Sequence, residues 1–420
     1  MLYAQKISGR LSTSAYAWEK YDTANQSDIL VRMVQTLQLE AAHGPLSFRT
    51  YLTGAAGSAG GIFTDGRVRV YNAFLRWNNL AGVADVNVGR IPVFAGVGIG
   101  TVDGLMFEGK TLQKKLTFKG FGGMNVNSAL QTKDNGKLRD NFSAGGQIAG
   151  WLTAKLRAGI SYLNRQHSSE SYYAIRADSF YNPYTLLVNP PLRREHLLGF
   201  DILYDESTFG SIYGRLDYDF LHKRALRGEI NVRADVMENL SVTGTVIHRE
   251  PRVFYRTIFS RLNSESVREY EGGLEYELCP WASTFGRFAV VQYDDDDGKR
   301  LTAGVSTKYG SITAAWTDGA VGSLASISVD GIYPIAGRVV VPTAGFSYSA
   351  YEYPGPSSQQ EDAVSGILGL VVRPMQMLSV DLQIQWLNNR IYSHDVRAFG
   401  KMSYWFSHTF TKHQQKEGVE

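Results

Sequence analysis

Apolar and polar residues alternate along this chain with a period of two, in segment after segment from its beginning to its end. Within 226–236, apolar residues and glycine at the even positions alternate with Arg227, Glu229, Asn231, Arg233 and Asp235 at the odd ones. The same rhythm recurs at 144–151, 211–220, 240–248, 270–278, 301–309, 344–351 and 378–386. Successive side chains of a β-strand point to opposite faces, so the pattern predicts strands with one apolar and one polar face. The fold class is therefore expected to be all-β.

The length of these segments separates a membrane barrel from a soluble β-sandwich. A tilted transmembrane strand needs about 9–11 residues, whereas strands of globular proteins are mostly about five or six residues long. Tight turns are predicted at 43–45, 78–79, 205–207, 237–239, 280–281, 309–310 and 374–375, and longer connections at 54–66, 124–142, 166–194, 249–266 and 352–361. Short turns at one end and longer loops at the other are typical of transmembrane barrels. We predict a transmembrane antiparallel up-and-down β-barrel of about 22 strands, within a range of roughly 18–22.

Composition agrees with this class and excludes others. The 420 residues include 43 glycines and 24 tyrosines, and their formal net charge of +3 gives no reason to expect a nucleic-acid partner. The single Cys279 excludes an internal disulfide framework and a cysteine-built metal cluster. No stretch approaches the roughly 18 consecutive apolar residues of a transmembrane helix.

The last predicted strand, 396–406, resembles the closing strand of bacterial outer-membrane proteins, which end on an aromatic residue that the assembly machinery reads. Phe406 is the first candidate for that aromatic and Phe410 the second. Over the whole chain the pattern is similar to porin-like outer-membrane β-barrel proteins, although no motif identifies one family. The resemblance implies the outer membrane of a Gram-negative bacterium, with lipid and lipopolysaccharide around the barrel.

Three segments are expected along the chain. Residues 1–5 fit the remnant of a secretory signal, because a small residue precedes Gln5, or else an unrelated N-terminus. Residues 6–406 are expected to form the barrel, and 407–420 a periplasmic tail.

Aromatic residues near the ends of the apolar faces fit the interfacial girdles of a membrane barrel. They are Trp77, Tyr162, Tyr204, Tyr218, Tyr276, Trp316, Tyr348, Trp386 and Tyr404. The alternative is ordinary strand propensity, since aromatic residues are enriched in any sheet.

Charged residues gather on the opposite, inward phase of the strands. The basic ones are Arg10, Arg32, Arg49, Arg76, Lys119, Arg157, Arg215, Arg227, Arg233 and Arg287, and the acidic ones include Glu229, Asp235 and Asp381. Glu269, Glu271, Glu275 and Glu277 share one face of a single strand. Only Arg287 on the following strand shares their phase, so this wall is expected to stay acidic and to favour cations. Solvated residues or inter-strand ion pairs are the alternative.

The sequence contains no strong motif for catalysis or for phosphate or metal binding. Gly96–Gly104 is rich in glycine but precedes another strand rather than a helix, so a loop folded into the lumen or a flexible turn is expected there, not a phosphate site. Asp294–Asp297 is interpreted as a solvated turn, and 393–395 as a loop despite its Ser, His and Asp. We therefore expect no enzyme, no catalytic residue, no metal site and no cofactor.

Two functions fit a barrel without catalytic residues. The first is a porin-like channel for small hydrophilic, polar solutes. The second is a structural barrel that sheathes or anchors a partner, such as another outer-membrane or periplasmic protein within the lumen, in an electron conduit or a secretion or surface assembly. The long segment 166–194 carries Tyr172, Tyr173, Phe180, Tyr181 and Tyr184, and we expect it to pack into the barrel mouth or to dock a partner.

Overall fold

Alternating residues form long strands, as β14 (Arg224–Met237) illustrates. Ile230 and Val232 lie on an exposed face of this strand. Glu229 and Arg233, on the other face, form hydrogen bonds with polar neighbours. The computed structural model describes residues 5–21, 27–59, 62–111, 115–127, 130, 137–168, 171–206, 208–251, 266–294, 296–320, 322–354 and 359–410.

The strands form one antiparallel sheet of 22 members, and a separate pair makes a second sheet. The first half of the large sheet consists of β1 (Gln5–Tyr21), β2 (Ser27–His43), β3 (Leu46–Ala59), β4 (Ile62–Leu80), β5 (Ala84–Ala95), β6 (Gly98–Thr111), β7 (Leu116–Asn125), β8 (Phe142–Trp151), β9 (Leu156–His167), β12 (Arg193–Glu206) and β13 (Gly210–Asp219). The second half consists of β14, β15 (Leu240–Arg249), β16 (Val267–Cys279), β17 (Ala282–Gln292), β18 (Asp297–Thr307), β19 (Gly310–Gly319), β20 (Ser323–Ile332), β21 (Val340–Glu352), β22 (Glu361–Met375), β23 (Leu378–Asn388) and β24 (Asp395–Phe410). A short 3-10 turn, η2 (Ala336–Arg338), precedes β21. Among the residues described, no helix is long and apolar enough to cross a membrane.

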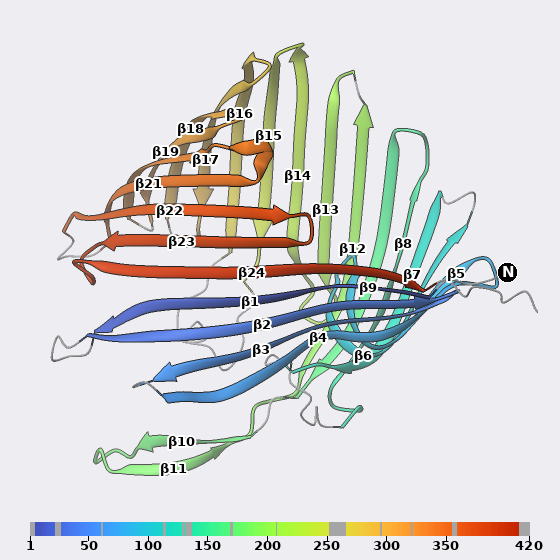
Figure 1. Cartoon of the computed structure of the whole chain (residues 1–420). Helices are drawn as coiled ribbons and strands as arrows, with labels where there is room; N and C mark the ends of the chain where they lie inside the picture. Colours follow the sequence, from blue (N-terminus) through green and yellow to red (C-terminus); the bar gives the residue numbers. More distant parts are fainter. Residues whose placement is uncertain are drawn as a thin grey trace, which may run out of the picture.

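The sheet closes on itself because β1 pairs with both β2 and β24. Figure 1 shows β22–β24 and β1–β3 running across the front of the barrel while β12–β16 stand behind them. At the closing seam, Ser12 and Ser403 are direct partners, and their buried hydroxyls form a hydrogen bond of 2.9 Å. Closure removes the free edges that a lipid-exposed sheet could not tolerate. The predicted barrel of about 22 strands is thereby confirmed.

The two ends of the barrel differ. Connections on the side of the chain termini are short, as at 44–45, 81–83, 238–239, 280–281 and 376–377, whereas 126–141, 168–192 and 250–266 join strands at the opposite end. By the rule that periplasmic turns are short, the termini lie at the periplasmic end. The last strand continues to Phe410, past the predicted bound at Phe406.

The predicted loop at 54–66 is wrong for most of its length. β3 continues to Ala59, and β4 begins at Ile62, so the two strands pair as far as Ala59 and Ile62. Small residues such as Gly54 and Ala55 break the alternation of large apolar and polar side chains, which is why the sequence pattern suggests a loop. The backbone still pairs, because sheet hydrogen bonds do not depend on the side chains.

Candidate functional site

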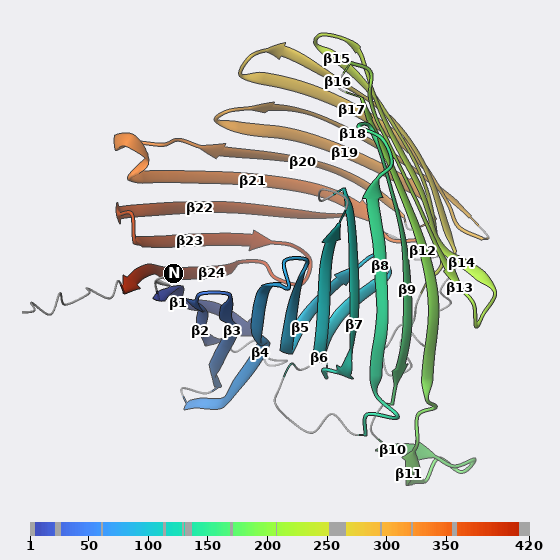
Figure 2. The ribbon, with the colours of Figure 1, turned by 90° about the vertical axis from the view of Figure 1, so that its right-hand side faces the viewer.

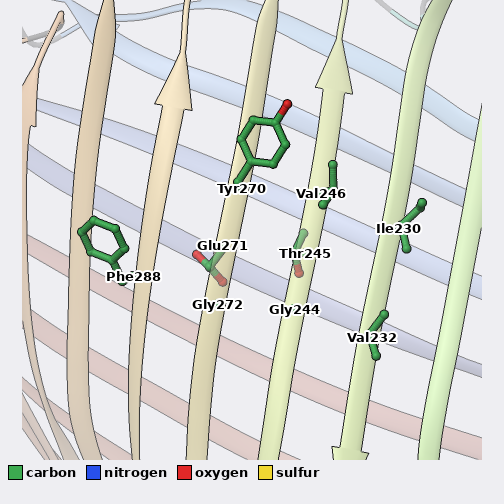
Figure 3. Close-up of a pocket in the computed structure, with 9 residues that line it drawn as sticks. All are labelled: Ile230, Val232, Gly244, Thr245, Val246, Tyr270, Glu271, Gly272 and Phe288. Atoms are coloured by element: carbon green, nitrogen blue, oxygen red, sulfur yellow. The ribbon is translucent and has the colours of Figure 1, made fainter.

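The outer face of the barrel is apolar. Figure 3 shows Ile230, Val232, Val246 and Phe288 on neighbouring strands, with the strands of the opposite wall crossing behind them. With Gly244 and Gly272 between them, these residues line a shallow hollow of about 450 Å³. Of the predicted girdle aromatics, all but Tyr218 are well exposed. A closed sheet with an apolar exterior can satisfy its backbone and bury its outer side chains in lipid.

The inner face carries ion pairs between neighbouring strands and along strands. Arg49 pairs with Glu40 at 2.8 Å, Arg157 with Asp201 at 3.4 Å, and Arg215 with Asp217 at 3.0 Å. Arg227 pairs with Glu229 two positions along the same strand. This arrangement corresponds to the alternative in which the inward charges compensate one another. At these positions the inner wall is polar, with opposite charges side by side.

The four glutamates of β16 lie on one face, but their wall is not the acidic surface that the sequence predicts. Glu275 is held by Arg233 at 2.5 Å and by Arg287 at 2.8 Å. Arg300 pairs with Glu271 at 2.9 Å and also with Glu269. The expectation that Arg287 alone faces these carboxylates is wrong, because β14 and β18 also supply arginines. Glu277 is the one of the four with no ion-pair partner among the described residues.

The hairpin of β5 and β6 leaves the wall. β5 pairs with β4 only up to Arg90, and β6 pairs with β7 only from Val102 onward. Between these points, Ile91–Thr101 pairs only within the hairpin. We call this stretch the inner hairpin. Figure 2 shows it passing behind β7, β8 and β9.

The tip of the inner hairpin is bonded to the polar face of β9, with β7 and β8 between them in the sheet. The amide of Val97 donates to the hydroxyl of Ser161 at 3.0 Å, and Arg165 donates to the carbonyl of Ile99. Lys119 of β7 donates to the carbonyl of Phe94 at 3.4 Å. These partners all lie on the inner face, so the expectation that the glycine-rich segment folds into the lumen is met by this geometry.

Apolar packing holds the same hairpin against the wall. Ile91 and Val93 are each 1% exposed and Ala95 is fully buried. They belong to an apolar cluster that also contains Phe74, Val97, Val102, Met106, Phe121, Leu163, Leu197 and Leu226. Burying such side chains contributes roughly 1.5–3 kcal/mol each. The opposite face of the hairpin carries Phe94 and Ile99, which are 66% and 54% exposed. An apolar surface therefore faces the remaining interior.

A buried arginine fixes the base of the inner hairpin. The guanidinium of Arg90 donates two hydrogen bonds of 2.8 Å to the carboxylate of Asp103 on the partner strand. Its third nitrogen donates to the carbonyls of Val70 and Leu130 at 3.2 Å. Leu130 also accepts a bond from the amide of Val70 at 2.8 Å. A bidentate arginine fork is geometrically specific. It ties β4, the hairpin and the segment after β7 together where the wall pairing ends.

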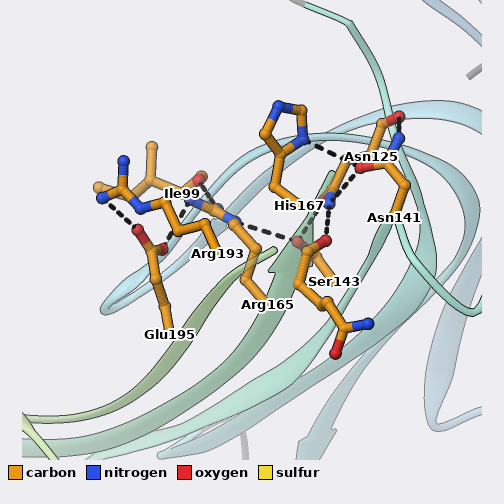
Figure 4. A network of polar contacts seen from close by, with 9 residues as sticks. Ile99, Asn125, Asn141, Ser143, Arg165, His167, Arg193 and Glu195 are labelled. Atoms are coloured by element: carbon orange, nitrogen blue, oxygen red, sulfur yellow. Dashed lines mark hydrogen bonds and ion pairs between the residues drawn. The ribbon is translucent and has the colours of Figure 1, made fainter. Parts of the chain in front are cut away.

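A polar network continues this anchoring towards the outer end of the barrel (Figure 4). Arg165 donates to Ser143 at 3.1 Å and to Glu195 at 3.4 Å, and Ser143 donates to Asn125 at 2.5 Å. Asn125 bonds Asn141 at 2.9 Å. Because Arg165 also donates to the carbonyl of Ile99, the network links the hairpin tip to four strands of the wall, β7, β8, β9 and β12.

The segment 166–194 contains a second hairpin, made of β10 (Tyr172–Ala177) and β11 (Pro183–Val188). It forms its own sheet and projects past the outer end of the barrel, so it does not pack into the mouth (Figures 1 and 2). Phe180 and Tyr181 at its tip are 82% and 89% exposed. Asp178 orders the tip by accepting the amides of Phe180 at 2.8 Å and Asn182 at 2.9 Å.

Sequence reasoning missed several residues of this site. Arg90, Ser161, Arg165 and Arg300 form the contacts described above, and none of them is among the site residues that the sequence predicts. Residues 301–309 alternate cleanly between apolar and polar. Extending this alternation by one residue towards the N-terminus places Arg300 on the inward face of β18, so this residue could be found from the sequence. No sequence signal predicts the partners of Ser161, since the hairpin crosses two strands to reach it.

No family model matches this chain, and no curated protein matches it. Among solved structures, a chain of the E. coli P pilus tip assembly intermediate PapC-PapD-PapK-PapG is 8% identical, with a TM-score of 0.50 over 98% of this chain and 61% of that chain. The translocation pore of the P pilus usher PapC is 8% identical (TM-score 0.47, 97% and 100% covered). OccAB4 of Acinetobacter baumannii is 9% identical (TM-score 0.45, 97% and 99% covered). At these identities the likeness concerns the fold alone. A closed sheet with an apolar exterior and a polar interior is the architecture of an outer-membrane β-barrel.

Proposed function

We propose that this barrel is a channel for small hydrophilic solutes and that the inner hairpin sets the width of its passage. The supporting observation is that Ile91–Thr101 leaves the wall and bonds to the inner face of β9. A hairpin in the lumen narrows a barrel whose strand number would otherwise enclose a wide space. The paired charges of the wall can hydrogen-bond water and polar solutes, and together they do not strongly favour cations or anions. Such a lining suits a channel for polar solutes.

Single-channel conductance in planar lipid bilayers tests this proposal. Pro92 and Thr101 are direct partners, so replacing 93–100 by Asn-Gly closes a two-residue turn between them. We expect the shortened chain to conduct more than the full chain at the same salt concentration. Ala174 and Leu186 are partners in the hairpin of β10 and β11, which we call the outer hairpin. Replacing 175–185 by Asn-Gly gives a matched control with unchanged conductance. A full chain that opens no channel, or equal conductance in both chains, contradicts the proposal.

A second function, anchoring a partner in an outer-membrane assembly, is favoured by the outer hairpin alone. Phe180 and Tyr181 are held at its ordered tip and are almost fully exposed. Exposed aromatic residues on a preformed support are typical anchors of protein interfaces. Because the inner hairpin already occupies part of the lumen, such a partner would bind outside the barrel. Photo-crosslinking from position 181 in cells, with position 188 as the control, would give a discrete adduct if this function holds and none if it does not.

A further inference from the structure

A cavity of about 880 Å³ lies on the inner face near the periplasmic end, where β24, β1, β2, β3 and β4 meet the inner hairpin. Two adjacent rows of cross-strand partners form its floor. Trp405, Arg10, Gln38 and Tyr51 are consecutive partners in one row, and Glu40 and Arg49 are partners in the next. Pro92 of the hairpin also lines the cavity. Its size falls in the range of about 300–1,000 Å³ that small-molecule sites occupy.

The electrostatics of this cavity favour one negative charge. Arg49 is paired with Glu40, so these two compensate each other. Arg10 has no ion pair and no hydrogen bond with any described residue, and its Nε is buried without an acceptor. Arg49 also keeps a buried Nε without an acceptor. The cavity therefore holds one uncompensated guanidinium and a second arginine with a free donor. A carboxylate offers two oxygens to such donors.

The neutral part of the lining favours a flat, apolar group. Trp405 stands directly across from Arg10, on the neighbouring strand. Tyr51 lies two strands away on the other side, and its ring is held by stacking on Tyr71 at a centroid distance of 4.6 Å. Pro92 bounds the cavity from the side of the hairpin. Aromatic rings favour stacked contacts with planar groups.

We infer that this cavity is a binding site for a planar aromatic monocarboxylate, with Arg10 and Arg49 on the carboxylate and Trp405 and Tyr51 beside the ring. A neutral sugar would leave the guanidinium of Arg10 uncompensated, and a dianion would exceed the single net positive charge. The inference rests on the proposed function, since the cavity would bind solutes that pass through the channel. It adds the chemical class of the solutes that bind there.

Equilibrium binding of 2-naphthoate to the full chain in detergent micelles tests this site without requiring conduction. We expect saturable binding by titration calorimetry, and weaker binding of the neutral isostere 2-naphthamide. Losing a charge-assisted hydrogen-bonding partner costs about 1.5–3 kcal/mol, so Arg10→Gln should weaken naphthoate binding by roughly tenfold or more. Arg10→Lys keeps the charge but loses the fork, and should fall between the two.

The matched control is Arg157→Gln, which removes an inner-face arginine that pairs with Asp201 outside the cavity. It should bind naphthoate as the unchanged chain does. Each variant is first checked for the compact, heat-modifiable migration of a folded barrel. Equal binding by the unchanged chain and Arg10→Gln, or equal affinity for the acid and the amide, overturns the inference. A chain that conducts but does not bind keeps the proposed function and loses the site. A chain that binds naphthoate but does not conduct keeps the site and loses the proposed function.

Discussion

The backbone amide of Val97 and the hydroxyl of Ser161 form a hydrogen bond of 3.0 Å across the inner face of the barrel. This bond joins the turn between β5 and β6 to β9, although β7 and β8 separate them in the sheet. Val97 also packs over Gly199 of β12, whose missing Cβ leaves the space that the valine side chain takes. The position of the inner hairpin therefore depends on the close contact of its tip with β9 and β12.

Gly96→Ala should displace this tip and widen the passage. Gly96 has a φ of +61°, and a Cβ there would lie 2.1 Å from the hydroxyl oxygen of Ser161. We expect higher or more variable single-channel conductance. Gly82→Ala is the matched control, because Gly82 has a φ of +80° but no atom within 4 Å of the added Cβ. It carries the same kind of backbone strain without pushing the hairpin. If both variants conduct like the unchanged chain, the tip does not set the passage.

Arg300→Gln should make the channel more selective for cations. The change leaves Glu269 and Glu271 without their arginine partner. One unit charge about 4 Å away is worth about 1 kcal/mol in water, or roughly fivefold for each ion, with opposite signs for K⁺ and Cl⁻. The permeability ratio of K⁺ to Cl⁻ should therefore rise several-fold. Lys299→Gln removes the same charge one residue away, on the other face of β18, and should leave the ratio nearly unchanged. Reversal potentials in a low-salt gradient measure both. A larger effect of the Lys299 change would contradict the placement of these ion pairs.

Ile327→Arg should destabilise the folded barrel in lipid, whereas Ser328→Arg should not. The two positions are adjacent on β20 and point to opposite faces, with Ile327 exposed on the apolar exterior. An arginine facing lipid near the midplane costs about 2–4 kcal/mol. Guanidinium titration of the chain folded into vesicles compares the two free energies of unfolding. Similar losses for both variants would mean that the faces of β20 are not lipid and lumen.

The two serines at the closing seam, where β1 pairs with β24, should make coupled contributions to the stability of the barrel. Ser12 and Ser403 are 4% and 2% exposed and bond each other at 2.9 Å. Replacing either one by alanine leaves a buried hydroxyl without this partner, which costs about 1–3 kcal/mol, while replacing both should cost less than the sum. Unfolding midpoints of the two single variants and the double variant give the coupling. Strict additivity would show that the hydroxyls do not depend on each other.

The sequence predicts the barrel well because alternation is a local property of each strand. The phase of 226–236 places Ile230 and Glu229 on opposite faces, and the structure has them so. What the sequence does not predict is how side chains of different strands meet. Arg233 and Arg300 reach the glutamates of β16 from β14 and β18, which lie two strands away from β16 on its two sides. Only the register of the folded sheet brings them together. The inner hairpin is a case of the same kind. Its glycines mark an unusual turn, but its contact with Ser161 depends on tertiary packing.

Acid should loosen the tip of the outer hairpin. At this tip, outside the membrane-spanning strands, the backbone amide of Asn182 bonds the carboxylate of Asp178, and this bond, with those from the Asn182 side chain and the amide of Phe180, lowers the pKa of Asp178. A carboxyl whose pKa is lower in the folded state stabilises that state fully above its unfolded pKa of about 3.9, and this contribution is lost as the pH falls through the folded value. We therefore expect amide protection factors at Phe180 and Asn182 to be constant at neutral pH and to fall below about pH 4. Asp178→Asn keeps a side-chain oxygen that can accept the same amides but does not titrate, so its protection should not change over that range. If the unchanged chain and this variant lose protection together, the carboxylate of Asp178 is not what orders the tip that presents Phe180 and Tyr181.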